Sequence, residues 1–394
     1  MPKQKSDLTS ELLSRLKLLG PSFLERRLNS DDKNFLPDEN ISNLIDSEVF
    51  KACQPKRLGG FELPFGVQTS AGAEIAKFCG SSGWIVSVLG THHWMVGKFS
   101  PKVQDDIWAK KPHSIVASAF ASVDEKVKTL KDGYEISGRW LYASGIHLCD
   151  WVIILCKIPQ NNSTPEMRFM IVPVDEINIM DTWRTIGLRA TGSHNIEIKN
   201  TFVPKYRTIT HREINMLDTP GTKDNPKSVY RIPMSGIINY CVAAPTLGMA
   251  EGALEAFTKD MAPRTSIFSK KIANNPTLQL RTSEASAEID CARLLYENDL
   301  SKIRSSVNQT KPLTINDLAK IKRNASYIGE LSKRATSRLS SAMGARGLNE
   351  KNLVHLANSD INAACSHVSM VWDSCSLPHG MAKLGVLTEE FLGP

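Results

Sequence analysis

The sequence lacks the short motifs that mark several large classes of enzyme. It contains no GxGxxG, no GxxxxGK[ST], no HExxH and no GxSxG pattern. These patterns belong to dinucleotide-binding turns, phosphate-binding loops, zinc peptidases and the nucleophile turn of serine hydrolases. All four interpretations therefore lose support.

Paired cysteines and long apolar runs are also missing. The eight cysteines form no CxxC pair and have no regular spacing, which predicts reduced thiols in the core of a cytosolic protein. The longest apolar runs, such as WVIILC, are too short to cross a bilayer, and charges interrupt the apolar positions near the N-terminus. We therefore expect a soluble, cytoplasmic protein with no secretory signal and no membrane partner.

Charge is not concentrated in any segment. The formal net charge of +7 arises from 48 basic and 41 acidic residues spread along the chain, without an aromatic-basic repeat. This distribution predicts a mildly basic surface and argues against nucleic-acid binding, while an anionic small ligand stays compatible with it. The nine histidines are not clustered at the spacing of metal ligands, so no metal site is predicted.

The 394 residues are 41% hydrophobic, enough for a large core, and the period of the hydrophobic positions changes twice along the chain. Residues 1–112 show the three- and four-residue spacing of helices. Residues 113–231 are rich in β-formers and contain an Asp132-Gly133 pair typical of a hairpin. Helical spacing returns over residues 232–394. This segregation predicts an α+β fold with separate helical and β domains at these bounds.

The two helical parts carry identifiable faces and ends. Thr314–Asp317 (TIND) predicts a capping box, Gly344 and Gly347 can end the helix that follows, and residues 218–228 read as a linker or loop. Two apolar stripes are predicted to face the core: Leu8, Leu12, Leu13, Leu16 and Leu19 in the first part, and Ile321, Ala325, Ile328, Leu331, Ala335 and Leu339 in the last.

Two histidines, His92 and His93, interrupt the apolar run VSVLGTHHWMVGKFS. Neighbouring residues on a helix point about 100° apart, so both imidazoles cannot face one site, and one of them is expected to pack or face solvent. His92 is either a satisfied core histidine or a general base, and His367, among alanines and valines, has the same two interpretations. The residues alone support an α+β soluble protein and leave open whether it is an enzyme.

Several longer motifs narrow the choice. RLGGFELPFGVQTSAGAEIAKFCGSSGW, ISGRWLYASGIHLCDWVI, DTWRTIGLRATGSHNIEIKNTFVP, RTSIFSKKIANNPTLQLRTSEASAEIDCARLL and GARGL follow one another in this order. From about residue 15 to the end, the chain resembles the acyl-CoA dehydrogenase superfold, and especially its two-component flavin-dependent monooxygenases, the group D aromatic hydroxylases. The resemblance implies an N-terminal helical domain, a central β-barrel or sandwich and a C-terminal four-helix bundle.

The dehydrogenase branch of this superfold uses a glutamate base at one of two places. Here Cys241 in NYCVAA stands at one of them, and the segment SDINAACSHVSMVWD offers His367 and no glutamate at the other. Acyl-CoA dehydrogenation is therefore disfavoured. An acyl-CoA dehydrogenase or oxidase with a displaced base stays open as the alternative, as does a flavin-free scaffold.

The resemblance to the hydroxylases implies the oxygenase component of a two-component enzyme. A separate NAD(P)H-dependent flavin reductase would supply reduced FMN or FAD, and O2 would be the co-substrate. A flavin C4a-hydroperoxide would then hydroxylate a phenol or an indole, with an indolic acid such as indole-3-acetate as one guess. His367 matches the histidine near the peroxide, Ser144 the serine beside flavin N5, and His92 the histidine that contacts the substrate and acts as base.

The remaining site residues also follow from the resemblance. Ser118 and Trp140 are expected to contact the flavin, and Trp84 and Trp94 could form an aromatic wall for the substrate or be plain core residues. Arg264 and Phe268 in RTSIF resemble an element that reaches the flavin of a neighbouring subunit, which implies a homo-oligomer, usually a tetramer; the alternative for Arg264 is a solvated helix-end arginine. One departure from the pattern is Ser359-Asp360 in place of Arg-Asp, which leaves the local ion pairing open.

Overall fold

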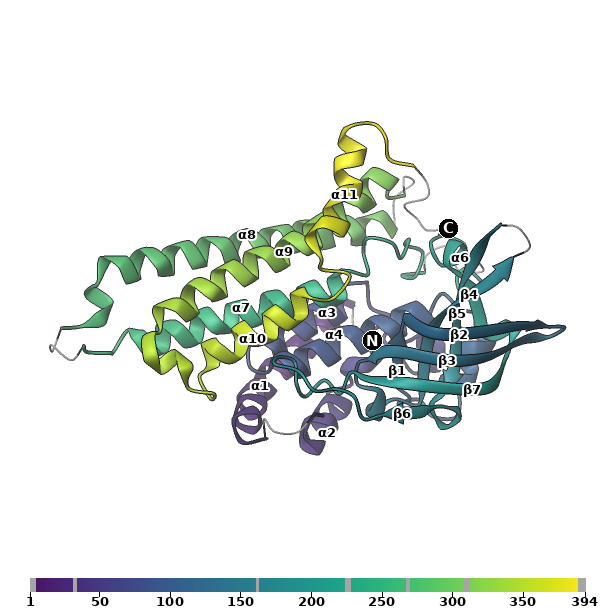
Figure 1. Cartoon of the computed structure of the whole chain (residues 1–394), viewed down its shortest axis with the longest axis horizontal. Coiled ribbons are helices and arrows are strands. Elements are labelled where there is room, and N and C mark those ends of the chain that lie inside the picture. Colours follow the sequence, from purple (N-terminus) through teal and green to yellow (C-terminus); the bar gives the residue numbers. More distant parts are fainter. Residues whose placement is uncertain are drawn as a thin grey trace.

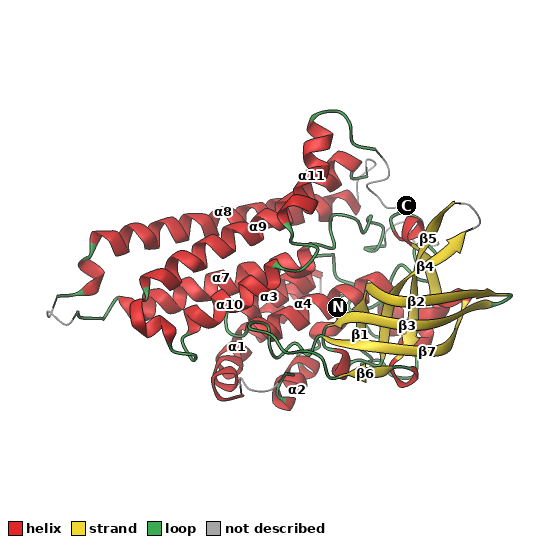
Figure 2. Ribbon diagram, in the orientation of Figure 1, coloured by secondary structure: helices red, strands yellow, loops and turns green. Residues whose placement is uncertain are grey.

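The computed structural model describes residues 5–30, 34–160, 163–223, 228–266, 270–307 and 312–388. Helices form both ends of the described chain and strands form its middle (Figures 1 and 2). The predicted order of helices, strands and helices is therefore confirmed. The boundaries predicted at residues 112 and 231 fall in connecting segments, and whether each part is a separate domain stays a prediction.

The first part packs around one fully enclosed helix. The N-terminal leucine stripe is confirmed, because Leu12 and Leu16 are buried and the other three leucines pack partly against the core. All residues of helix α4 are buried, and its small residues permit close packing: a Cβ on Gly83 would lie 2.5 Å from that of Ala76 on α3. The helices are α1 (Lys5–Ser30), α2 (Asp38–Asp46), α3 (Val67–Ala76), α4 (Gly80–Val96) and α5 (Pro101–Trp108).

The middle part consists of two four-stranded sheets with the orders β1-β4-β5-β8 and β2-β3-β7-β6. Strands β4 and β5 run across β2, β3 and β7 in Figure 2, and the indole of Trp140 on β3 donates to the carbonyl oxygen of Leu155 on β4 at 2.9 Å. The pair β1–β4 is parallel and the others are antiparallel. The strands are β1 (Val116–Ala119), β2 (Ala121–Leu130), β3 (Gly133–Ala143), β4 (Trp151–Gln160), β5 (Ser163–Pro173), β6 (Asn178–Met180), β7 (His194–Pro204) and β8 (Thr208–Thr210).

The predicted hairpin joins β2 and β3, with Leu130 opposite Gly133. Its two loop residues are Lys131 and Asp132, so the glycine lies on the strand and not in the turn. A Cβ at Gly133 would lie 2.3 Å from the carbonyl oxygen of Val203 on β7. Gly133 is therefore needed for the close approach of the neighbouring strand.

The last part is a bundle of α7, α8, α9 and α10, in which α7 also packs on α3 and α4 (Figure 1). The predicted face of α9 is buried, the capping box at Thr314 is present, and Gly344 follows the helix end with φ +65°. The helices of this part are α7 (Tyr240–Met261), α8 (Pro276–Val307), α9 (Ile315–Ala342), α10 (Leu353–Cys365) and α11 (Trp372–Lys383), and the short helix α6 (His211–Ile214) belongs to the middle part, after β8. Short 3-10 turns lie at Val49–Lys51, Lys56–Leu58, Ile146–Leu148, Val174–Glu176, Lys205–Arg207, Ile272–Asn274 and Gly344–Leu348.

The eight cysteines are all free thiols. Six of them are buried and Cys365 is partly buried, but Cys291 is exposed on α8. The prediction of core thiols is therefore wrong for Cys291, which lies on the outer face of a helix with few buried residues. Among the described helices, none combines the length and the apolar character needed to span a membrane.

Candidate functional site

Three predicted site residues from distant parts of the chain meet at one place. The indole nitrogen of Trp84 on α4 donates to the hydroxyl of Ser144, directly after β3, at 3.3 Å. The same indole ring lies edge-on to the imidazole of His367, beyond the end of α10, with 5.8 Å between ring centroids. Ser144 and His367 are only partly buried, so both can contact a ligand.

His367 is held as a neutral imidazole with a defined tautomer. Its Nδ1 accepts the backbone N–H of Ser369 at 3.1 Å, so the ring proton lies on Nε2. Burial lowers the pKa of His367 to about 4, because the charged form is poorly solvated there. His367 can therefore offer an N–H donor at neutral pH without carrying charge.

A second pair of predicted residues meets further along α4. Nδ1 of His92 lies 2.9 Å from the carbonyl oxygen of Val116, which can only accept, so Nδ1 carries the proton. The free Nε2 then accepts the hydroxyl of Ser118 on β1 at 2.8 Å. Burial lowers the pKa of His92 to about 3, so the imidazole stays neutral. Ser118 is partly exposed and His92 is buried, so a ligand meets the serine first.

The two groups lie on one side of α4. Trp84 and His92 are eight residues apart, which places them about 80° apart around the helix and about 12 Å apart along it. Helix α4 thus presents one aromatic residue and one imidazole toward the strand ends that carry Ser144 and Ser118. This arrangement suits two adjacent ligands or one elongated ligand.

Behind Ser144 lies a chain of hydroxyl groups that the sequence analysis missed. Ser193 Oγ is 2.7 Å from Ser144 Oγ and 2.7 Å from Thr191 Oγ1, and Thr191 donates to the carbonyl oxygen of Leu188 at 2.9 Å. Both additional residues are buried and lie in the motif GLRATGS. The sequence signal that could have identified them is the pair of hydroxyl residues on either side of Gly192 in this motif.

The turn that begins this motif is fixed by a buried ion pair. Asp360 on α10 accepts the backbone N–H of Leu188 at 2.7 Å and pairs with Arg27 on α1 at 2.8 Å. Leu188 has φ +52°, a conformation that needs such support. The sequence leaves open which residue pairs with Asp360, because Ser359 stands where the pattern has an arginine. The structure shows that Arg27, near the other end of the chain, is this partner. An adjacent cavity of about 30 Å³ has room for water.

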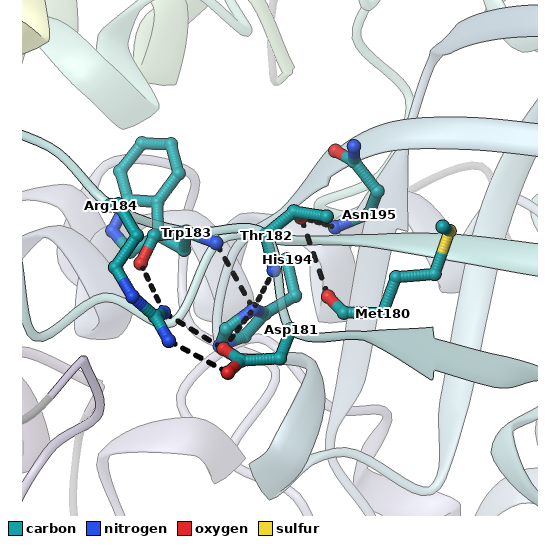
Figure 3. Close-up of polar contacts among 7 residues, drawn as sticks. All are labelled: Met180, Asp181, Thr182, Trp183, Arg184, His194 and Asn195. Carbon is teal, nitrogen blue, oxygen red and sulfur yellow. Dashed lines mark hydrogen bonds and ion pairs between the residues drawn. The ribbon is translucent and has the colours of Figure 1, made fainter.

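His194, at the start of β7, holds the segment before this turn (Figure 3). Its Nδ1 accepts the backbone N–H groups of Thr182 at 3.1 Å and Trp183 at 3.3 Å. Burial and the nearby His147 lower the pKa of His194. A neutral His194 is therefore a structural acceptor, and it ties residues 180–184 to the strand that follows Ser193.

The remaining predicted residues are not brought to this site by contacts. The imidazole of His93 bonds to the carbonyl oxygen of Phe50 at 2.7 Å, and Trp94 packs edge-on against Phe65. Trp140 lies between the sheets. The guanidinium of Arg264 contacts the sulfur of Met261 at the end of α7 and lies 3.9 Å from a carboxylate oxygen of Asp260. Phe268 lies outside the described residues. One of the two neighbouring histidines was expected to pack, and His93 does so against Phe50 and Trp108.

The position of one dehydrogenase base is filled by a thiol that cannot act as one. Cys241 lies in the first turn of α7, and burial raises its pKa to about 12. It is therefore protonated at neutral pH. Within the described residues, no cluster of three or more histidine, cysteine or acidic side chains could hold a metal ion.

Comparisons with known proteins show which proteins this chain is similar to. Residues 240–372 match the family model for the C-terminal domain of acyl-CoA dehydrogenase. The oxygenase component of FADH2-dependent resorcinol hydroxylase from Rhizobium sp. (strain MTP-10005) is 28% identical over 387 residues, which cover 95% of this chain and 94% of the relative.

Solved structures show the same fold over nearly the whole chain. The 3-HSA hydroxylase from Rhodococcus sp. RHA1 has a TM-score of 0.92 and 25% identity and covers 97% of this chain and 98% of its own. XiaF from Streptomyces sp., in complex with FADH2 and glycerol, has a TM-score of 0.88 and 22% identity, covering 97% of this chain and 96% of its own. The predicted acyl-CoA dehydrogenase-like fold and the resemblance to flavin-dependent oxygenase components are confirmed.

Proposed function

We propose that this chain, which has the acyl-CoA dehydrogenase fold and is similar over 95% of its length to the oxygenase component of a flavin-dependent hydroxylase, hydroxylates an aromatic substrate with reduced flavin and O2. The observation that carries the proposal is the meeting of Trp84, Ser144 and His367. Neutral donors and acceptors of this kind suit the edge of a flavin ring, and the carboxylate base of the dehydrogenases is absent from both expected positions.

Reduced FMN or FAD, when bound, supplies the activation of O2 that the protein's own side chains lack. Ser144 offers a hydroxyl oxygen to the ring, and Trp84 fixes the position of that oxygen. His367 offers an uncharged N–H donor, which can hold an oxygen atom without giving away a proton at neutral pH. Together these groups would bind and orient the cofactor and retain oxygen beside it.

We propose that His92 receives the substrate together with Ser118, which the resemblance instead expects to contact the flavin, because the two side chains are hydrogen-bonded. The Ser118 hydroxyl donates to His92, so its oxygen is free to accept a hydrogen bond from the substrate. A phenol O–H or an indole N–H provides that donor, and removing its proton makes the ring more electron-rich. A proton passed through Ser118 would reach Nε2 of His92, and because burial lowers the pKa of His92 to about 3, the imidazole shares this proton along the hydrogen bonds and does not retain it. The resorcinol hydroxylase relative acts on a phenol, which favours a phenol over an indolic acid such as indole-3-acetate.

The proposed partners are a separate reductase and further copies of the chain. An oxygenase component needs an NAD(P)H-dependent flavin reductase, which delivers reduced flavin. Arg264 lies mostly buried just after α7, and the resemblance expects this residue to contact the flavin of a neighbouring subunit. We therefore propose a homotetramer with shared flavin sites.

The experiment that tests the function combines the purified protein with a generic flavin reductase, NADH, FMN or FAD, and a panel of phenols and indoles. Substrate-dependent O2 uptake and a product heavier by one oxygen atom are expected. An acyl-CoA dehydrogenase would instead retain oxidised FAD, and acyl-CoA would bleach its absorbance. That result, with no hydroxylated product from any member of the panel, would refute the proposal.

A further inference from the structure

The hydroxyl chain behind Ser144 has a direction that the hydrogen-bond partners impose. The carbonyl oxygen of Leu188 can only accept, so the single hydroxyl proton of Thr191 is used there. Ser193 must then donate its own proton to Thr191, because the contact between them needs one donor. By the same reasoning Ser144 donates its proton to Ser193.

The direction of the chain leaves Ser144 without a proton to offer. A hydroxyl group has one donor and two acceptor sites. Ser144 spends its donor on Ser193, and one of its lone pairs receives the indole N–H of Trp84. Its remaining lone pair, on the partly exposed side, can only accept a hydrogen bond.

Reduced and oxidised flavin differ at N5, the atom that the resemblance to the hydroxylases places beside Ser144. Nitrogen N5 carries a hydrogen in the reduced flavin and a bare lone pair in the oxidised one. Building on the proposed function, we infer that Thr191 and Ser193 are positioning residues that make Ser144 an obligate acceptor, so that the protein selects reduced over oxidised flavin. In oxidised flavin the lone pair of N5 would face the lone pair of Ser144, which weakens binding. In reduced flavin the N5–H would donate to Ser144 and so complete the chain of hydrogen bonds.

The structure offers a matched variant. Thr191→Val keeps the shape of the side chain and removes the acceptor of Ser193. The carbonyl oxygen of Leu188 still receives the backbone N–H of Thr191 and the indole N–H of Trp183, each at 3.1 Å, so the turn keeps its support. Ser193 would then turn its proton toward Ser144, and Ser144 could donate to oxidised flavin. Ser193→Ala frees the Ser144 proton more directly, and Thr191→Ser keeps the chain intact.

The test measures dissociation constants of oxidised FMN in air and of dithionite-reduced FMN under nitrogen, by ultrafiltration of the full-length protein. We expect the parent and Thr191→Ser to bind reduced FMN with a dissociation constant lower than that of oxidised FMN by about tenfold or more. This ratio corresponds to one hydrogen bond that reduced FMN makes and oxidised FMN replaces with a repulsive contact. Thr191→Val and Ser193→Ala should lose most of this preference, mainly through tighter binding of oxidised FMN.

The inference would be overturned if the ratio of the two dissociation constants were the same in the parent, in Thr191→Val and in Ser193→Ala. It would also be overturned if the parent bound oxidised and reduced FMN equally. If such a parent still hydroxylates a phenol, the proposed function survives and the hydroxyl chain alone is wrongly interpreted. A parent that binds neither form would overturn the proposed function and this inference together.

Discussion

The hydroxyl oxygen of Ser118 lies 2.8 Å from Nε2 of His92, between the buried imidazole and the side from which a ligand can approach. The two residues come from a helix and a strand, and the backbone carbonyl of Val116 fixes which nitrogen of His92 is free. The pair acts as one unit, with an accessible hydroxyl in front of a neutral base.

Loss of either member should therefore impair oxygen transfer to the substrate. His92→Ala and Ser118→Ala are each expected to lower the rate of hydroxylation by about 10²-fold, a typical contribution of a positioned base, while reduced flavin is still oxidised at a near-normal rate. The pH dependence of hydroxylation should change in both. Rapid-mixing kinetics with product analysis by mass spectrometry provides the measurement.

His93→Gln is the matched control, because the neighbouring imidazole bonds to Phe50 and packs against Trp108. It should leave the pH profile of hydroxylation in place. If His92→Ala hydroxylates like the parent, His92 is a core histidine and the substrate site is wrongly placed.

His367→Ala should uncouple flavin oxidation from hydroxylation. Without the Nε2–H donor beside Trp84, oxygen is expected to leave as H2O2 in place of reaching the substrate. The ratio of H2O2 released to flavin oxidised should rise several-fold, while reduced flavin still binds. His367→Asn, which retains an N–H donor, should recover part of the coupling. An unchanged H2O2 yield in His367→Ala would show that His367 does not retain oxygen beside the flavin.

Breaking the ion pair between Arg27 and Asp360 should destabilise the fold and the loop behind Ser144. Both side chains are largely buried, so Asp360→Ala leaves a buried charge and an unbonded Leu188 N–H, at an expected cost of about 3–5 kcal/mol in the free energy of unfolding. Urea unfolding measures this cost. The double variant Arg27→Met, Asp360→Ala should lose less than the two single changes combined, and strict additivity would show that the pair does not interact.

Two histidines with lowered pKa values, the buried His92 and the partly buried His367, should make the fold sensitive to acid. Folded pKa values of about 3 for His92 and about 4 for His367 lie below the ordinary value of 6.5, so the unfolded chain binds protons in this interval and the folded chain does not. Stability therefore falls as the pH drops from about 6.5 toward 4, by up to about 1.4 kcal/mol per pH unit for each histidine. His367→Gln should reduce this slope, measured by urea unfolding at several pH values, and an unchanged slope would contradict the prediction.

The sequence predicts the elements of this fold well because each carries a local signal. The periodic face of α9, its capping box and the hairpin before β3 depend on residues that are neighbours in the chain. The helix spacing also separates His92 from His93 in direction. It cannot show that α4 is covered on every side, which is why both imidazoles are buried.

The contacts that complete the site could not be predicted, because they join residues far apart in the sequence. Ser144 meets Ser193 across 49 positions, and Arg27 meets Asp360 across 333. Predicting either pair requires the packing of the β sheets against α4 and α10. The resemblance to a family supplied Ser144 and His367 as candidates, but the hydroxyl chain behind Ser144 emerges only from the structure.

The most direct test of the proposed oxygenase is a single turnover under 18O2. One equivalent of reduced FMN or FAD is bound to the protein under nitrogen and mixed with 18O2 and a phenol. The product should carry one 18O atom, in a yield approaching one per reduced flavin. Full oxidation of bound flavin with no 18O in the product of any phenol or indole would contradict the account.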